Sequence, residues 1–304
     1  MPDQYVFIVG MPKTGTKLVK NILENSTKNN FKISPEIHFL GHLVNLIRPG
    51  LRHKVQKLGD RFDDDTIRKF VTYLFQSGES NPNYSYLRQL RSGQLRIDKE
   101  ELIKSMLESN RSDKEIYKIL LTSHVKVYDK VILGEKAPPN LWHVPELIKW
   151  FPDAKIIHTF RDPRAILSSQ WISKIERPVD YYIFKSSNPM YTFMIVLHIT
   201  VAWLYAVFLH KKYQRLYPNN YFFIKFEDII NDPPYSIQKL CRFLEIEFDE
   251  QMLKPRQQGS SYSQRITTGF NVATLNRWES YLPRWMKRWM ILFTKKYLKE
   301  FGYI

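Results

Sequence analysis

The chain has 304 residues, of which 43% are hydrophobic and 14% aromatic, so it can bury a sizeable core and is not a disordered chain. Its net charge of +16 favours anionic ligands or surfaces: nucleotides, sulfated or phosphorylated molecules, nucleic acid or anionic lipid. The single cysteine, Cys241, excludes an intrachain disulfide and a cysteine-based zinc site. Because no signal peptide precedes the first predicted strand, we expect a cytoplasmic protein.

The N-terminal stretch predicts a strand, a loop and a helix. Residues 5–10 form a β-branched and aromatic run that is typical of a buried parallel strand. Residues 11–17 (MPKTGTK) follow as a loop, and apolar residues then recur at helical spacing over 18–23. A loop that opens onto a helix N-terminus directs backbone N–H groups and the positive end of the dipole to one place, which suits a phosphate.

This loop resembles the P-loop, G-x-x-x-x-G-K-S/T, only in part. Gly10 and Gly15 have the right separation, but Thr16 occupies the position of the lysine and Lys17 that of the hydroxyl residue. The pattern therefore disfavours the alternative of a P-loop kinase, which needs a magnesium-binding hydroxyl. Lys13 remains as the cation inside the loop, and a basic turn without a ligand is the plainer interpretation.

The segment after the first helix carries two candidate proton-transfer groups. Glu36 and His38 stand two residues apart in SPEIHFL, which suits an active-site rim, although a solvated glutamate on a loop is as good an interpretation. Residues 41–130 alternate basic and apolar residues at helical spacing. We expect a helical insertion there that either shapes an acceptor cleft or simply packs.

Two further strands are expected to end in charged residues. Residues 130–134 predict a buried strand that leads into Glu135 and Lys136, at the edge where an open parallel sheet places its ligand contacts. Residues 155–160 predict the next strand, and His158 within it is expected to be a core histidine.

The second of these strands delivers Arg161, and Ser169 lies about two turns along the following helix. A guanidinium and a hydroxyl so placed could hold one phosphate. The alternative is that Arg161 pairs with Asp162 at the helix start. Residues 221–226 predict a fourth strand.

Two segments raise the question of a membrane. Residues 190–209 are uncharged and about long enough to span a bilayer, but His198 lies in their middle, so we predict a helix buried in the core. Residues 284–290 interleave tryptophan with basic residues, which suits a membrane surface or a polyanion, whereas a packed terminal helix is the more frequent outcome. Peripheral membrane contact stays open, and a membrane-associated basic binding protein is the alternative function.

Six segments, in this order and spacing, resemble the sulfotransferases that use 3′-phosphoadenosine-5′-phosphosulfate (PAPS). They are MPKTGTK, SPEIHF, GEKAPPN, FPDAKIIHTFRDPRAILSS, KFEDIINDP and NVATLNRWESYLP. SPEIHF is similar to the carbohydrate branch of the family and the last segment to the tyrosylprotein branch. The resemblance implies an α/β fold with a P-loop-like parallel sheet flanked by helices, as a single domain over residues 1–304 with the helical insertion at about 41–130.

The resemblance also implies a role for each matching residue. The 5′-phosphosulfate would be held by the loop residues Lys13, Thr14, Gly15, Thr16 and Lys17. The 3′-phosphate would be bound by Arg161 and Ser169, and Arg277 would contact the donor. Glu36 matches the position of the family's catalytic base, and Lys136 matches a lysine that faces the moving sulfuryl group in the family. A family serine falls near Ser261 or Ser263.

Two positions depart from the family pattern. Phe226 stands where the family often has a tyrosine, so a hydroxyl contact is lost. Lys17 replaces a second threonine or serine in the loop, which removes a hydroxyl but adds a cation.

The chemistry that the resemblance implies is in-line sulfuryl transfer without a metal. Glu36 would take the proton of the acceptor hydroxyl, with His38 as the reserve base, while Lys13 and Lys136 stabilise charge. We expect the acceptor to be a glycan or glycolipid rather than a peptide tyrosine. Nucleic acid is not expected, because no motif that reads it appears.

Overall fold

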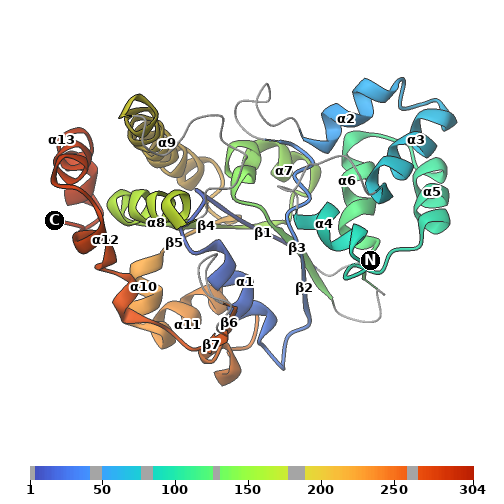
Figure 1. The fold of residues 1–304 in the computed structure, drawn as a ribbon. Coiled ribbons are helices and arrows are strands. Elements are labelled where there is room, and N and C mark those ends of the chain that lie inside the picture. The colour runs from blue at the N-terminus through green and yellow to red at the C-terminus, as the bar shows by residue number, and fades with distance from the viewer. Residues whose placement is uncertain (1–3, 42–49, 77–84, 126–130, 177–188, 259–265) are drawn as a thin grey trace. The chain divides into compact units, whose positions relative to one another are not determined.

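The structure is a computed structural model that describes residues 4–41, 50–76, 85–125, 131–176, 189–258 and 266–304. The chain forms two compact units, each assembled from separate segments (Figure 1). The first unit contains Met1–Val9 and Asn29–Ile156, and the second contains Gly10–Lys28 and Ile157–Ile304. The expectation of one domain over residues 1–304 stays a prediction.

The predicted α/β fold with a parallel sheet is confirmed. A five-stranded sheet has the strand order β2-β3-β1-β4-β5. Its strands are β1 (Gln4–Gly10), β2 (Phe31–Ser34), β3 (Ile132–Lys136), β4 (Lys155–Phe160) and β5 (Tyr221–Lys225). In the first unit, β3 pairs in parallel with both β1 and β2, and Gly134 lies opposite Val6 on one side and Ile33 on the other. A Cβ at Gly134 would lie 2.0 Å from the carbonyl oxygen of Val6, so only glycine fits there.

The bounds of β3 correct the sequence prediction. The strand was expected over 130–134, but it begins at Ile132 and continues through Glu135 and Lys136, which pair with Phe7 and Ile8 of β1. Residue 130 lies outside the described residues. The two charged residues therefore belong to the strand itself and not to the loop after it.

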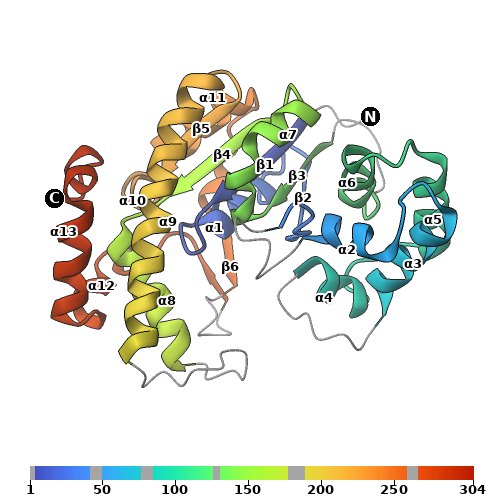
Figure 2. The same cartoon turned by 90° about the horizontal axis from the view of Figure 1, so that it is seen from above.

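Besides its strands, the described part of the first unit consists of short helices (Figure 2). They are α2 (Leu51–Leu58), α3 (Asp64–Phe75), α4 (Ser85–Arg91), α5 (Lys99–Glu108), α6 (Asp113–Thr122), the 3₁₀ helix η1 (Pro138–His143) and α7 (Val144–Trp150). Three of them begin where a side chain caps the first turn: Asp63, Asp98 and Ser112 accept from the backbone N–H groups of Asp65, Glu101 and Glu115. These caps explain why residues 41–130, with their alternating basic and apolar residues, fold into separate short helices where the structure describes them.

The second unit contains the remaining elements. They are α1 (Thr16–Glu24), α8 (Pro163–Glu176), α9 (Pro189–Leu216), α10 (Phe226–Asn231), α11 (Pro233–Leu244), η2 (Glu250–Leu253), β6 (Arg256–Gln258), β7 (Ile266–Thr268), η3 (Val272–Thr274), α12 (Arg277–Tyr281) and α13 (Arg284–Glu300). Its core includes the rings of Phe160, Trp203 and Phe301, whose centroids lie 4.8 to 6.4 Å apart. β5 ends one residue earlier than predicted, because Phe226 begins α10.

His158 is a core histidine, as predicted. Its side chain is fully buried in β4, and Nδ1 is hydrogen-bonded to the hydroxyl of Tyr221. Burial, helped by the neighbouring His210, lowers the pKa of His158 well below its ordinary value, so the ring is neutral.

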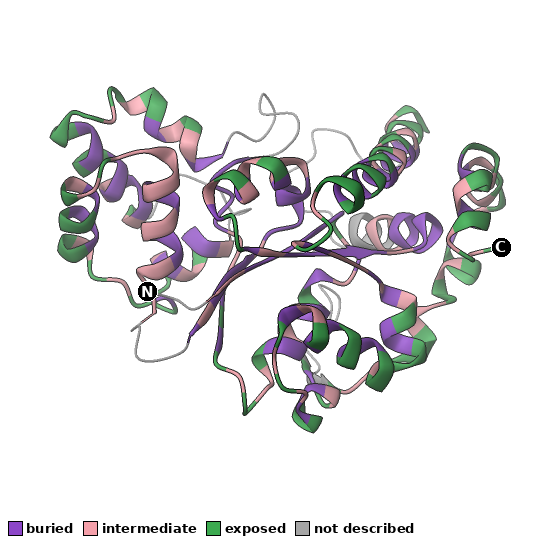
Figure 3. Cartoon of the chain, turned by 180° about the vertical axis from the view of Figure 1, so that it is seen from behind, coloured by how far each residue is buried: buried purple, intermediate pink, exposed green. Residues whose placement is uncertain are grey.

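Helix α9 corrects the expectation for residues 190–209. The helix was predicted to be buried in the core, but only one face is buried, and Met194, Val201 and Phe208 are each more than half exposed (Figure 3). By length and composition alone α9 could cross a membrane, yet half of its most apolar window is buried inside the fold. Composition gave no sign of the exposed face, because that face is as apolar as the buried one.

Candidate active site

The loop between β1 and α1 is held in a conformation that few residue types can adopt. Lys13 has a φ of 75° and Gly15 a φ of 96°, both in the left-handed region. A Cβ at Gly15 would lie 2.6 Å from the ring of Phe226, so the loop packs directly on that ring. Phe226 lacks the hydroxyl expected from the family. Its ring instead supports the loop through close packing against Gly15.

The hydroxyl of Thr14 is used inside the loop. It donates to the carbonyl of Met11 at 2.7 Å and is hydrogen-bonded to the hydroxyl of Thr159 in β4 at 2.8 Å. Thr16 is buried at the start of α1, and Lys17 is exposed on the first turn. The N-cap of α1 is Gly15, so no side chain caps the first turn, and a helix start of this kind suits a ligand such as a phosphate.

Arg161, at the end of β4, joins this loop to a second segment. Its Nη1 donates to the carbonyl of Lys13 at 3.2 Å and its Nη2 to the carbonyl of Thr274 at 2.9 Å. The guanidinium lies over the ring of Phe226 at 4.2 Å, and burial lowers its pKa from the ordinary arginine value. Within the described residues its Nε is buried without a hydrogen-bond partner. A buried cationic N–H of this kind fits a phosphate oxygen, so these residues fit a phosphorylated donor.

The alternative that Arg161 pairs with Asp162 is resolved by a third residue. Arg164 donates to both carboxylate oxygens of Asp162, with Nε–Oδ1 and Nη2–Oδ2 distances of 3.0 and 2.6 Å. The guanidinium of Arg164 also lies over the ring of Trp278. The ion pair that closes the start of α8 is therefore Arg164–Asp162. Arg161 is left to face the loop.

Glu227 supports the same turn and had no role in the sequence analysis. Its carboxylate accepts from the backbone N–H of Asp162 at 3.0 Å and from the hydroxyl of Tyr303 at 3.2 Å. Burial raises the pKa of Glu227. The only sequence signal was its place in the KFEDIINDP segment, because its partners are more than sixty residues away.

The other residues predicted to contact the sulfuryl donor lie on two helices, α8 and α12. Ser169 is half-buried in α8, and Arg277 is exposed at the start of α12. Ser261 and Ser263 lie outside the described residues. In the part of the chain that the structure describes, no group of three or more His, Cys, Asp or Glu side chains could hold a metal ion.

In the first unit the structure brings Glu36, His38 and Lys136 together. One carboxylate oxygen of Glu36 pairs with Nζ of Lys136, and the other lies 3.0 Å from Nε2 of His38. Burial on its own would raise the pKa of Glu36, but the hydrogen bond with His38 and the charge of Lys136 outweigh it and lower the pKa to about 2. Glu36 is therefore a carboxylate with two cation-capable partners.

Glu135, fully buried on β3, fixes the backbone of the segment that carries Glu36. Its Oε1 accepts from the N–H groups of Ile37 and His38 at 2.6 and 3.3 Å. Its Oε2 accepts from the hydroxyl of Tyr117 and from the amide of Asn140. Burial raises the pKa of Glu135, although four donors face it. The sequence placed Glu135 only among the expected ligand contacts at the sheet edge, because its partners at residues 37, 38 and 117 are distant in the chain.

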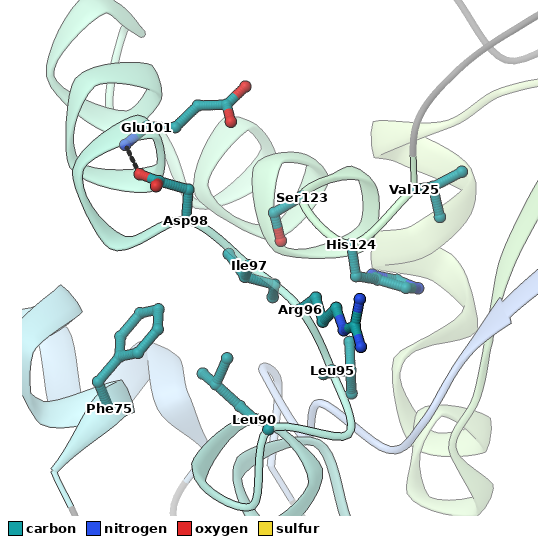
Figure 4. A pocket seen from close by; sticks show the side chains of 11 residues that line it. Phe75, Leu90, Leu95, Arg96, Ile97, Asp98, Glu101, Ser123, His124 and Val125 are labelled. Carbon is teal, nitrogen blue, oxygen red and sulfur yellow. Dashed lines mark hydrogen bonds between the residues drawn. The ribbon is translucent and has the colours of Figure 1, made fainter.

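The helical part of the first unit contains a cavity of about 970 Å³ (Figure 4). Its lining mixes apolar side chains with charged and polar ones: Phe75, Leu90, Gly93, Leu95, Arg96, Ile97, Asp98, Glu101, Ser123, His124 and Val125. Helix α4 connects this cavity to Glu36. Ser85 at its start accepts from the N–H of Glu36 at 2.9 Å, and Leu90 near its end lines the cavity.

Comparison with known proteins agrees with the resemblance seen in the sequence. A family model described as "Sulfotransferase family" matches residues 5–250. A comparison with curated proteins gives no match.

Solved structures share the fold at low sequence identity. The sulfotransferase domain from the Synechococcus PCC 7002 olefin synthase is 18% identical with a TM-score of 0.58, covering 97% of this chain and 94% of that one. The sulfotransferase domain from the curacin biosynthetic pathway is 16% identical with a TM-score of 0.54, covering 97% of both chains. A mouse sulfotransferase complexed with PAP is 15% identical with a TM-score of 0.52, covering 100% of this chain and 90% of that one.

Proposed function

Because the chain belongs to the sulfotransferase family and is a PAPS-dependent enzyme, we propose that it transfers a sulfuryl group from PAPS to a hydroxyl of a glycan or glycolipid. The observation that carries the proposal is the Nε of Arg161, which is buried without a partner among the described residues, beside a loop that opens onto a helix with no side-chain cap. The bound donor supplies an activated sulfuryl group and leaves as adenosine 3′,5′-bisphosphate (PAP). The mouse relative in the comparison was solved with PAP, which supports this donor.

The second unit would hold the donor. Lys13 and the first N–H groups of α1 would bind the 5′-phosphosulfate, together with Thr16 and Lys17. Arg161 would bind the 3′-phosphate through its unpartnered Nε, with Ser169 and Arg277 as further contacts. Thr14 would act differently from the family expectation, because its hydroxyl shapes the loop from inside.

The first unit would supply the proton acceptor. The acceptor oxygen forms its bond to sulfur as the donor's S–O bond breaks, and Glu36 takes the acceptor's proton. A carboxylate with a pKa of about 2 is a weak base, and its pairing with Lys136 is one cause of that value. If Lys136 turned to the negative charge of the sulfuryl group, one cause of the lowered pKa of Glu36 would be removed, and the pKa would rise and make the carboxylate a better base. His38 remains on Glu36 as the reserve base.

The cavity in the helical insertion supports a large amphipathic acceptor. Its lining includes leucine, isoleucine and phenylalanine side chains together with arginine, aspartate, glutamate and histidine (Figure 4). Such a lining suits a molecule with both sugar hydroxyls and an apolar portion. SPEIHF, the segment that is similar to the carbohydrate branch, carries Glu36 and supports the same class of acceptor.

Calorimetric titration with PAP tests the donor site. We expect binding by the wild type, loss of binding in Lys13→Ala and Arg161→Ala, and normal binding in Lys239→Ala, an exposed lysine of the same unit. Failure of the folded wild type to bind PAP would overturn the proposal. Screening of glycan, glycolipid and tyrosyl-peptide acceptors, with Glu36→Gln as the inactive control, then tests the acceptor class.

A further inference from the structure

Exposed apolar side chains gather on two helices of the second unit. Of fifteen large hydrophobic residues that are exposed in the described part of the chain, ten lie on α9 and α13. They are Met190, Phe193, Met194, Val201, Tyr205, Phe208, Leu216, Trp285, Leu292 and Phe293. Soluble proteins usually scatter such residues singly, so this concentration marks an interaction surface.

On α9 these residues form a single stripe that ends in cations. Val201, Tyr205, Phe208, Lys212 and Arg215 are all exposed and are spaced alternately by four and three residues, which places them on one face. The opposite face is fixed in the fold: the indole N–H of Trp203, for example, donates to the carbonyl of Arg161 at 3.0 Å. The exposed stripe therefore lies on the side of α9 away from the face that packs in the fold.

Helix α13 extends this surface. The indole N–H of Trp289 donates to the hydroxyl of Thr200 in α9 at 3.1 Å. The same ring lies 5.2 Å from Phe193 and 4.3 Å from Phe293, so aromatic rings connect the exposed side chains of the two helices. Along α13 one exposed stripe combines apolar and basic side chains: Trp285, Arg288, Leu292, Lys295 and Lys299.

The charge on this surface selects the partner. The two helices carry nine lysines and arginines and a single acidic residue, Glu300, which pairs with Lys211. A second copy of the chain would bring the same positive charge and be repelled. An anionic lipid surface satisfies both features, because apolar side chains enter the boundary with the acyl chains and the cations meet the headgroups.

We infer that this face, the exposed side of α9 and α13, docks the protein on an anionic membrane surface. The contact is peripheral, because the buried half of α9 is packed in the second unit and cannot face lipid at the same time. The inference does not depend on the proposed transfer reaction, since none of the residues on this face belongs to the donor site or to the Glu36 cluster.

Co-sedimentation with lipid vesicles tests the inference. We expect the full chain to bind vesicles that contain phosphatidylserine, to bind pure phosphatidylcholine vesicles at least tenfold less, and to be released by high salt or carbonate. Phe208→Glu and the double variant Lys212→Glu/Arg215→Glu should each lose most of the binding. Tyr235→Glu is the matched control, because Tyr235 on α11 is 55% exposed and Phe208 is 56% exposed.

Several results would overturn the inference. They are failure of the wild type to bind anionic vesicles, an equal loss in Tyr235→Glu, and retention in the membrane after carbonate extraction, which would show a true span. A wild-type dimer that Phe208→Glu converts to a monomer, without vesicle binding, would assign the face to a second copy. PAP titration of the same variants separates the two proposals, because donor binding should be unchanged in all of them.

Discussion

Glu135 and Lys136, adjacent residues of β3, hold the same segment in two different ways. The buried carboxylate of Glu135 accepts from the backbone N–H groups of Ile37 and His38, while the ammonium of Lys136 pairs with the side chain of Glu36. Neighbouring side chains of a strand point to opposite faces. Glu135 therefore fixes the backbone of residues 37 and 38, whereas Lys136 places a positive charge beside the carboxylate of Glu36. The geometry of Glu36 is therefore determined by β3 as much as by its own loop.

We expect Glu135→Gln to reduce kcat about tenfold while the KM for PAPS is unchanged. Glutamine can accept at one position only, so at least one of the four donors that face Glu135 loses its partner, at a cost of about 1–3 kcal/mol in stability. Steady-state kinetics and thermal unfolding measure both effects. Tyr117→Phe, which removes one donor and leaves the carboxylate, should show a smaller loss; an equal rise in the KM for PAPS would contradict a role limited to positioning Glu36.

The pH dependence of kcat/KM should distinguish Glu36 from His38 as the base. This ratio reports ionisations of the free enzyme, in which Glu36 has a pKa of about 2. The lowered pKa means that the ionised, active form is present above about pH 2 and is lost only as the pH falls through that value. We therefore expect kcat/KM to be flat from about pH 8 to about pH 5, and a fall in kcat/KM with acid over this range would contradict Glu36 as the base.

Replacement of Lys136 by methionine should lower kcat on the order of 100-fold, because it removes the cation that we propose to stabilise the transition state. The same change should raise the pKa of Glu36, since burial is then opposed by His38 alone. The acid limb of kcat/KM should move to higher pH as a result. Lys32→Met, an exposed lysine on β2 of the same unit, is the control and should change neither quantity.

Gly15→Ala should weaken both the fold and the binding of PAP. The residue has a φ of 96°, and an added Cβ would lie 2.6 Å from the ring of Phe226. Gly302→Ala is a matched control in the same unit, because Gly302 has a φ of 73° but no atom within 4 Å of the added Cβ. We expect the control to lose about 1–2 kcal/mol from the backbone term alone. Equal losses in the two variants, measured by denaturant unfolding, would show that contact with Phe226 is unimportant.

Local sequence signals predicted the elements that carry the loop and Arg161. The strand over 5–10, the loop with its glycines and the following helix depend on residues close in sequence, so their pattern was sufficient. The role of Glu135 was not predictable in the same way, because its partners are residues 37, 38, 117 and 140. The choice between Asp162 and the loop as the partner of Arg161 depended on Arg164, whose pairing only the folded turn reveals.

The exposed face of α9 shows a different limit. A helix that is apolar all round has no polar stripe to indicate which side faces water, so composition predicted burial throughout. The neighbouring elements decide which face is covered, and α13 lies too far along the chain for periodicity to report it.

The division of the chain into units has a consequence for its synthesis on the ribosome. The loop that carries Lys13 is among the first segments made, yet it belongs to the second unit, and its partners Arg161 and Phe226 follow about 150 and more than 200 residues later. Chains fold from the N-terminal part onward during translation, and every segment of the unit that carries Glu36 has been made by Ile156. The nascent protein can thus complete the cluster of Glu36, His38 and Lys136 long before the second unit is complete, and the loop must wait for its partners while most of the polypeptide emerges.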